Sequence, residues 1–220
     1  MNNILDNLLG KNNWVARCIN LERCNNRRDT FEKFAKDIDL NFDFFKGVDK
    51  RDLKKEEIFV YINNDRYPHD GGTACFLSHY NLYNYLLNNY SCEYFFIFED
   101  DAGFKNSNKK ELFDFFENVK KTGINWGVLE FGYHDTGFNQ RINIDNNLCL
   151  IQHKHLAHAF LVKRECIIFM LEEIEKNIKS PRCPPIDWIK DFIFKKTIVL
   201  GPRYTIIDQV DTISIIGSCE

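Results

Sequence analysis

The stretch Tyr94–Asp101 (YFFIFEDD) decides the fold class of this chain. Its first five residues form an unbroken apolar run, which is typical of a β-strand buried on both faces of a parallel sheet. Glu99, Asp100 and Asp101 follow directly, at the edge where open α/β sheets bind their ligands. Adjacent carboxylates repel one another and are stabilised by a cation, and oxygen ligands suit Mg²⁺ or Mn²⁺. The stretch therefore predicts an α/β domain with either a metal site or an ordinary solvated acidic turn at this edge.

Apolar runs and amphipathic segments alternate on both sides of this stretch. Strands are predicted at residues 14–21, 42–48, 94–98, 128–131, 148–152, 157–162, 198–200 and 204–207. Helices are predicted at residues 28–38, 79–90, 109–121, 165–178 and 186–195. The runs at 148–152 and 157–162 are expected to pair with each other. Because strand and helix alternate in the first half, we expect one α/β domain over residues 1–220, with a mixed, mostly parallel central sheet flanked by helices. Residues 1–13 are expected to form an N-terminal extension.

The composition excludes some classes of protein. With 44% hydrophobic and 28% charged residues, the 220-residue chain is not intrinsically disordered. Its formal net charge of −3 argues against a nucleic-acid partner. The eight cysteines form no Cys-x-x-Cys pair, which indicates free thiols in a reducing compartment. Since no apolar run resembles a membrane span or a signal peptide, we expect a cytoplasmic protein. Frequent Asn, Lys, Ile and Phe indicate an AT-rich genome, such as that of a bacterium or a large virus.

Two further segments offer groups that suit an anionic ligand. In residues 71–79 (GGTACFLSH), small residues let the backbone approach a ligand, and a helix predicted to begin near Ser78 favours negative charge at its N-terminus. Residues 19–27 (INLERCNNR) end the first predicted strand and carry Arg23 and Arg27, which share one face if the segment is helical. Either segment alone is also compatible with a plain turn.

Together, the three segments resemble glycosyltransferase family 25, which contains bacterial lipooligosaccharide galactosyltransferases and procollagen galactosyltransferases. The family pattern I-N-L-x-R-x-x-x-R is matched at Ile19, Asn20, Leu21, Arg23 and Arg27. The pattern G-x-x-(G/A)-C-x-x-S-H is matched at Gly71, Ala74, Cys75, Ser78 and His79. The E-D-D motif is matched at Glu99, Asp100 and Asp101. Weaker matches follow at Leu129, Gly132, His158–Phe160, Pro185–Asp187 and Gln209. Order and spacing hold from about Val15 to Ile215, with departures at Leu156, Phe160 and residues 211–216.

The resemblance implies a GT-A-type fold, a UDP-hexose donor, Mn²⁺ (or Mg²⁺) and inversion at the anomeric carbon. It implies that Asp101, together with Asp100, holds the metal. It also implies that the donor is contacted by a larger set of residues: Asn20, Arg23, Arg27, Gly71, Ser78, His79, Glu99 and Asp100. The acceptor would be a hydroxyl of a glycan, a lipid-linked saccharide or a protein.

Inversion also needs a general base for the acceptor hydroxyl. Asp187 matches the late P-x-D position of the family and precedes Trp188, so it is our candidate. An ordinary helix N-cap is the competing interpretation of Asp187. Glu130 and Asp135 are further candidates for the base.

Two other functions remain open from the sequence. The same metal site would permit hydrolysis of a UDP-sugar, with water as the acceptor. A non-catalytic nucleotide-sugar-binding protein on the same scaffold is the alternative from another class. The intact Glu99–Asp101 motif favours the enzyme.

Overall fold

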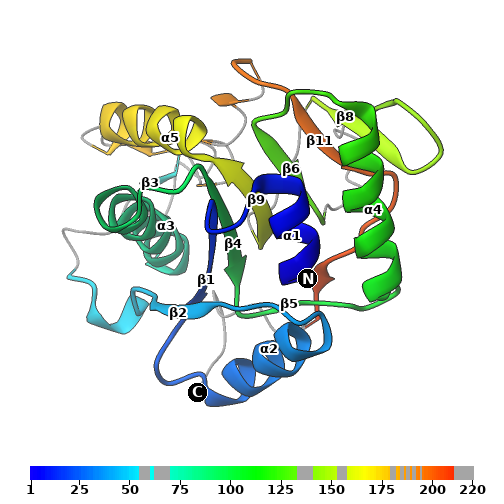
Figure 1. Ribbon diagram of the computed structural model, residues 1–220. Coiled ribbons are helices and arrows are strands. Elements are labelled where there is room, and N and C mark those ends of the chain that lie inside the picture. Colours follow the sequence, from blue (N-terminus) through cyan, green and yellow to red (C-terminus); the bar gives the residue numbers. More distant parts are fainter. Residues whose placement is uncertain are drawn as a thin grey trace.

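A sheet of eight strands, with helices on both faces, organises the chain (Figure 1). The computed structural model describes residues 1–54, 60–61, 70–132, 141–152, 158–178, 182–183, 186, 189, 192–193 and 195–210. The strand order is β2 (Asp43–Lys46), β1 (Trp14–Asn20), β4 (Tyr94–Glu99), β9 (Ala159–Lys163), β6 (Val128–Glu130), β11 (Val199–Pro202), β8 (Leu148–Ile151) and β7 (Arg141–Asn143). Two further pairs are β3 (Val60–Tyr61) with β10 (Arg182–Cys183), and β5 (Ala102–Gly103) with β12 (Asp208–Gln209). The helices are α1 (Asn2–Leu9), α2 (Asn25–Asp37), α3 (Asp70–Asn89), α4 (Lys109–Thr122), α5 (Arg164–Asn177) and the short 3₁₀ helix η1 (Lys50–Asp52).

Most strands of the main sheet run in one direction. β2, β1 and β4 are mutually parallel, and β11 is parallel to β6. β9 is antiparallel to both β4 and β6, and β8 is antiparallel to both β11 and β7. Within this sheet, only β8 and β9 therefore run against the other strands. The predicted mixed, mostly parallel α/β sheet is confirmed.

Alternation along β4 divides the core into two layers. Phe96 and Phe98 point to the cluster that α1, α2 and α4 cover. Phe95 and Ile97 point to the opposite cluster, beneath α3 and α5. Since successive side chains of a strand point to opposite faces, an all-apolar strand is required where helices cover both sides of the sheet.

Helix α4 shows how local sequence sets an element's bounds. The Asn108 side chain accepts from the backbone N–H of Lys110 and Glu111, and Glu111 reaches back to the Asn108 N–H, which forms a capping box. Gly123 ends the helix in the left-handed conformation that glycine adopts without strain. These signals explain why the predicted helix at 109–121 agrees with the observed one.

Three expectations about secondary structure were wrong. β8 and β9 do not pair, because β6 and β11 lie between them in the sheet. Residues 204–207 form no strand; the short strand β12 begins at Asp208. The helix predicted to begin near Ser78 begins at Asp70, whose carboxylate accepts from the Gly71 N–H at 2.7 Å. Gly71–Ala74 are buried in its first turns, so these small residues belong to a helix and do not form a plain turn.

The N-terminal residues, expected to be an extension, form α1 and contribute to the core. Leu5 and Leu9 are buried in the same hydrophobic cluster as the apolar side chains of α4.

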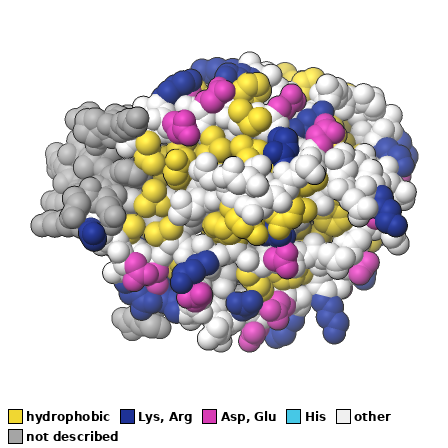
Figure 2. Space-filling view, turned by 60° about the vertical axis from the view of Figure 1, so that its left-hand side comes forward, with side chains coloured by type: hydrophobic (Ala, Val, Ile, Leu, Met, Phe, Trp, Pro, Cys, Tyr) yellow, Lys and Arg dark blue, Asp and Glu magenta, His cyan; other side chains and the backbone are white. Residues whose placement is uncertain are grey.

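On the face that Figure 2 shows, basic and acidic side chains lie interspersed around hydrophobic ones. Within the described part of the chain, no helix combines the length and the apolar character needed to cross a bilayer.

The first prediction concerns the aromatic layer under α2. Phe31 is fully buried and contacts the rings of Phe34, Phe42, Phe44 and Phe98 edge-on. Phe31→Ala leaves a cavity in this layer and should lower the free energy of unfolding by about 3–5 kcal/mol.

The control is Phe192→Ala, because the Phe192 side chain is 41% exposed, and its cost should be within about 0.5 kcal/mol. Urea denaturation of the three proteins measures both values. Equal losses in the two variants would show that the ring cluster does not stabilise the fold as described.

Candidate functional site

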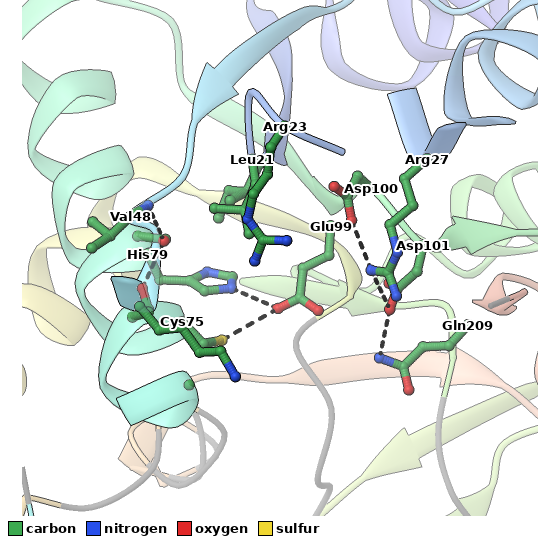
Figure 3. A pocket seen from close by; sticks show the side chains of 15 residues that line it. Leu21, Arg23, Arg27, Val48, Cys75, His79, Glu99, Asp100, Asp101 and Gln209 are labelled. Carbon is green, nitrogen blue, oxygen red and sulfur yellow. Dashed lines mark hydrogen bonds and ion pairs between the residues drawn. The ribbon is translucent and has the colours of Figure 1, made fainter. Parts of the chain in front are cut away.

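A cavity opens at the carboxyl ends of β1 and β4. Its empty volume is about 700 Å³, the open mouth included. The two strands are parallel neighbours with Ile19 opposite Glu99, so residues that follow each strand meet at this edge. The lining comes from Ile19, Leu21, Arg23, Arg27, Val48, Lys50, Gly71, Ala74, Cys75, Ser78, His79, Glu99, Asp100, Asp101 and Gln209. Figure 3 shows the charged side chains converging on this space.

Asp100 is held from two sides in the floor of the site. Asn20 Nδ2 donates to Asp100 Oδ2 at 2.8 Å, and Arg27 Nη1 donates to Asp100 Oδ1 at 3.0 Å. All three side chains are buried. Burial raises the pKa of Asp100, against the opposing effect of Asn20 and Arg27. The end of β1, the first turn of α2 and the end of β4 are therefore joined by one buried ion pair and one amide.

Asp101 has one carboxylate oxygen without a hydrogen-bond partner. Its Oδ2 accepts from Gln209 Nε2 at 3.2 Å and lies 3.5 Å from Arg27 Nη1. Its Oδ1 is buried and has no hydrogen-bond partner. Burial, followed by the charge of Glu99, raises the pKa of Asp101. A buried carboxylate oxygen without a partner is costly, and a bound cation would offset that cost. A carboxylate oxygen is the kind of ligand that a hard divalent ion takes, so the chemistry of Asp101 is compatible with such an ion.

Glu99 is positioned by helix α3. Its Oε1 lies 3.0 Å from His79 Nε2 and accepts from Cys75 Sγ at 3.7 Å. His79 is fully buried, and its Nδ1 lies 3.3 Å from the Tyr83 hydroxyl. Burial works to raise the pKa of Glu99, but the hydrogen bond with His79 outweighs it and the pKa is lowered. Glu99 is therefore a charged side chain held in a fixed orientation in the cavity lining.

Arg23 is anchored by a residue that the sequence did not single out. Its Nε donates to Asp49 Oδ2 at 2.6 Å, and Arg51 Nη2 lies 2.8 Å from the same oxygen. Burial works to raise the pKa of Asp49, yet the hydrogen bonds from Arg51 and Arg23 hold it well below its usual range. Because Asp49 and Arg23 are 26 residues apart, no local pattern could reveal the pair.

Ser78 joins the cavity wall to the loop after β2. Its Oγ donates to Ala74 O at 2.7 Å and accepts from the Val48 N–H at 2.8 Å. Since the hydroxyl makes both bonds within the protein, its observed role is to fix the wall. Gly71 and Ala74, from the first turns of α3, also line the cavity.

The predicted residues divide into three groups. Arg23, Arg27, Gly71, Ser78, His79, Glu99, Asp100 and Asp101 all line the cavity, and Asn20 lies behind it. Glu130 is buried at the end of β6, away from the cavity lining. Asp187 and Asp135 lie outside the described residues. Gln209, a weak match in the sequence, reaches Asp101 from β12 across 108 residues.

The chain matches the model of a known protein family over a part that contains most of the sheet and the cavity's carboxylates and arginines. The family profile described as "Glycosyltransferase family 25 (LPS biosynthesis protein)" covers residues 16–177, which is well over half of the chain. The class is therefore that of the glycosyltransferases. The chain belongs to glycosyltransferase family 25, as the resemblance indicated.

The three proteins compared below are distant from this chain. Procollagen galactosyltransferase 2 of Mus musculus is 23% identical over 124 residues, which cover 52% of this chain and 20% of the mouse protein. The chain thus spans about a fifth of the length of that relative. Among solved structures, A197 from STIV has a TM-score of 0.43 at 11% identity and covers 88% of this chain and 82% of its own. UDP-glucose pyrophosphorylase complexed with UDP-glucose has a TM-score of 0.44 at 10% identity, with 84% and 67% covered.

The buried ion pair generates the second prediction. Arg27→Met removes the positive charge beside Asp100 and Asp101 and leaves the two buried carboxylates with amide donors, from Asn20 and Gln209, but without this cation. The free energy of unfolding at neutral pH should fall by about 3–5 kcal/mol.

Arg28, the next residue, gives a matched control. Its side chain is about half exposed and pairs with Glu32 at 3.6 Å. Arg28→Met should cost less than about 1 kcal/mol. Denaturant titrations compare the two variants. A loss at Arg27 no larger than that at Arg28 would contradict the buried network.

Proposed function

We propose that this chain transfers a hexose from a UDP-sugar to a hydroxyl of a glycan, a lipid-linked saccharide or a protein, with inversion and with help from a divalent cation. The observation that carries the proposal is that Asp101, which lines the cavity together with Arg23 and Arg27, has a buried Oδ1 without a hydrogen-bond partner. Membership of glycosyltransferase family 25 supports sugar transfer as the reaction. The mixed sheet, with its acidic motif at the end of β4, supports a GT-A-type architecture.

The charges in the cavity suit a nucleoside diphosphate. Arg23 and Lys50 line the cavity and place positive charge where phosphate groups could be bound. Mn²⁺ or Mg²⁺, held by Asp101 with Asp100 nearby, would supply positive charge to the leaving diphosphate. Glu99, fixed by His79, faces the same space and can accept hydrogen bonds from sugar or ribose hydroxyls.

The neighbours of Asp101 have a supporting role in this proposal. Both oxygens of Asp100 already accept hydrogen bonds, from Asn20 and Arg27. Its role as a metal ligand, which the resemblance implies, would require it to share one of these oxygens. Arg27 lies between the two aspartates and keeps them from repelling each other in the absence of a cation.

The third prediction tests the cation site by its effect on donor binding. Asp101→Asn removes the carboxylate that we assign to the metal. Loss of an outer partner of a metal ligand typically costs 10–100-fold in metal affinity, so loss of the ligand itself should weaken Mn²⁺-dependent UDP binding by at least about 100-fold. Isothermal titration of UDP, with Mn²⁺ and then with EDTA, measures the effect.

Asp37→Asn is the control, because Asp37 lies on α2 with its side chain 55% exposed, away from the cavity. It should bind UDP as the unaltered protein does. Full Mn²⁺-dependent binding by the Asp101 variant would show that the metal binds elsewhere.

UDP release from a panel of UDP-sugars, measured without an acceptor, would identify the donor. Fast release of UDP in this assay would favour the hydrolase.

The fourth prediction concerns the general base. Asp187, which lies outside the described residues, is proposed as the base from its match to the family's P-x-D position. Asp187→Ala should keep UDP-sugar binding and lose transfer by more than about 100-fold, as expected when general-base catalysis is removed. Donor titration and a transfer assay, run on the same preparation, separate the two effects. Transfer at the original rate would exclude Asp187 as the base.

A further inference from the structure

Three different metal-binding side chains meet on the α3 side of the cavity. Cys75 and His79 are four residues apart on α3, so both side chains lie on the same helix face. Glu99 reaches them from the end of β4. Figure 3 shows these three side chains as one group, and Asp100, Arg27, Asp101 and Gln209 as another. The cation site proposed above for Mn²⁺ uses Asp101, from the second group, and no side chain of the first group.

The distances within the first group fit a tetrahedral ion. Cys75 Sγ, His79 Nε2 and Glu99 Oε1 all lie within 4.8 Å of one another. Oε1 is 3.0 Å from Nε2 and 3.7 Å from Sγ. Zinc bonds of about 2.0–2.3 Å place neighbouring ligand atoms of a tetrahedron roughly 3.3–3.8 Å apart. Small side-chain shifts would therefore bring the three atoms to the corners of a zinc tetrahedron.

The surroundings of His79 prepare the imidazole to be a ligand. Its ring is buried and stacks against Phe160 with centroids 6.4 Å apart. With a metal on Nε2, the proton lies on Nδ1, which is 3.3 Å from the Tyr83 hydroxyl that can accept it. Metal-binding histidines almost always donate their second N–H in this way, which fixes the ring and its tautomer.

We propose that Cys75, His79 and Glu99 form a second cation site, selective for Zn²⁺ and similar borderline divalent ions over hard ones. A thiolate and an imidazole favour Zn²⁺ over Mn²⁺ and Mg²⁺. The thiol of Cys75 gives its proton to solvent when the ion binds. A thiolate and a carboxylate then balance the charge of the ion, and the fourth position faces the cavity. The site stands on this geometry and does not depend on the proposed transfer reaction.

Occupation of this site has a consequence for the cavity. The ion would take Glu99 away from any ligand bound there and would fill part of the wall. If the proposed function holds, Zn²⁺ should compete with the UDP-sugar even in excess Mn²⁺. Cation identity would thus control whether the cavity accepts its donor.

The fifth prediction uses Co²⁺ as a coloured probe for the zinc site. Titration of the whole protein, in reduced form, should give one tightly bound Co²⁺ with intense tetrahedral visible bands and a thiolate charge-transfer band. One equivalent of Zn²⁺ should abolish both bands. Cys75→Ser should remove the charge-transfer band and weaken Zn²⁺ binding by at least about tenfold, since one of three protein ligands is changed.

Two controls separate this site from others. Cys92→Ser alters a cysteine that bonds the Tyr94 carbonyl outside the cavity lining, so it should keep the bands. Asp101→Asn should keep them too, which distinguishes failure of the zinc site from failure of the proposed donor site. Glu99→Gln serves as a second test should Cys75→Ser fold poorly, and it should weaken Co²⁺ binding. The proposal is overturned by an unchanged charge-transfer band in the Cys75 variant, or by a Co²⁺ spectrum without one in the unaltered protein.

Discussion

The buried ion pair between Arg27 and Asp100 is the interaction on which the site depends. It joins the first turn of α2 to the end of β4 at 3.0 Å, and the same guanidinium lies 3.5 Å from Asp101. A buried ion pair is often no more stabilising than apolar side chains of the same volume, because the desolvation of both charges offsets their attraction. The role of the Arg27–Asp100 pair in this site is to fix the positions of the side chains around it. With Arg27 fixed, Asp100 is paired, and Asp101, whose Oδ1 has no hydrogen-bond partner, is held in the cavity lining.

The sheet supplies the rigidity behind that arrangement. β4 is buried on both faces, and β1 and β4 run parallel, so the segments after them are brought to one place. Strand β12, late in the chain, also contributes to the site, because its pairing with β5 brings Gln209 to Asp101. Gly132 permits a close approach nearby, because a Cβ there would lie 2.1 Å from the Ile207 carbonyl oxygen. Residues more than a hundred positions apart thus share one site.

Much of this arrangement could be predicted from the sequence. The contacts that could not be predicted join residues far apart in the chain. Strand β4 and helix α4 follow from an apolar run and a capping box, both local signals. The family motifs identified most of the cavity lining because they follow strands or lie on α3. Asp49 and Gln209 were not assigned roles, since their partners Arg23 and Asp101 lie 26 and 108 residues away. The start of α3 was misplaced, because buried glycines in a helix look like a turn in sequence.

The measurement that tests the central claim most directly is a crystal structure with Mn²⁺ and UDP, with the ion located by the anomalous scattering of manganese. The account predicts one strong peak at coordination distance from Asp101 Oδ1, with the UDP diphosphate beside it and the Arg27–Asp100 pair intact. A manganese peak at Cys75 and His79 instead, or UDP bound away from the ends of β1 and β4, would contradict the assignment of this site.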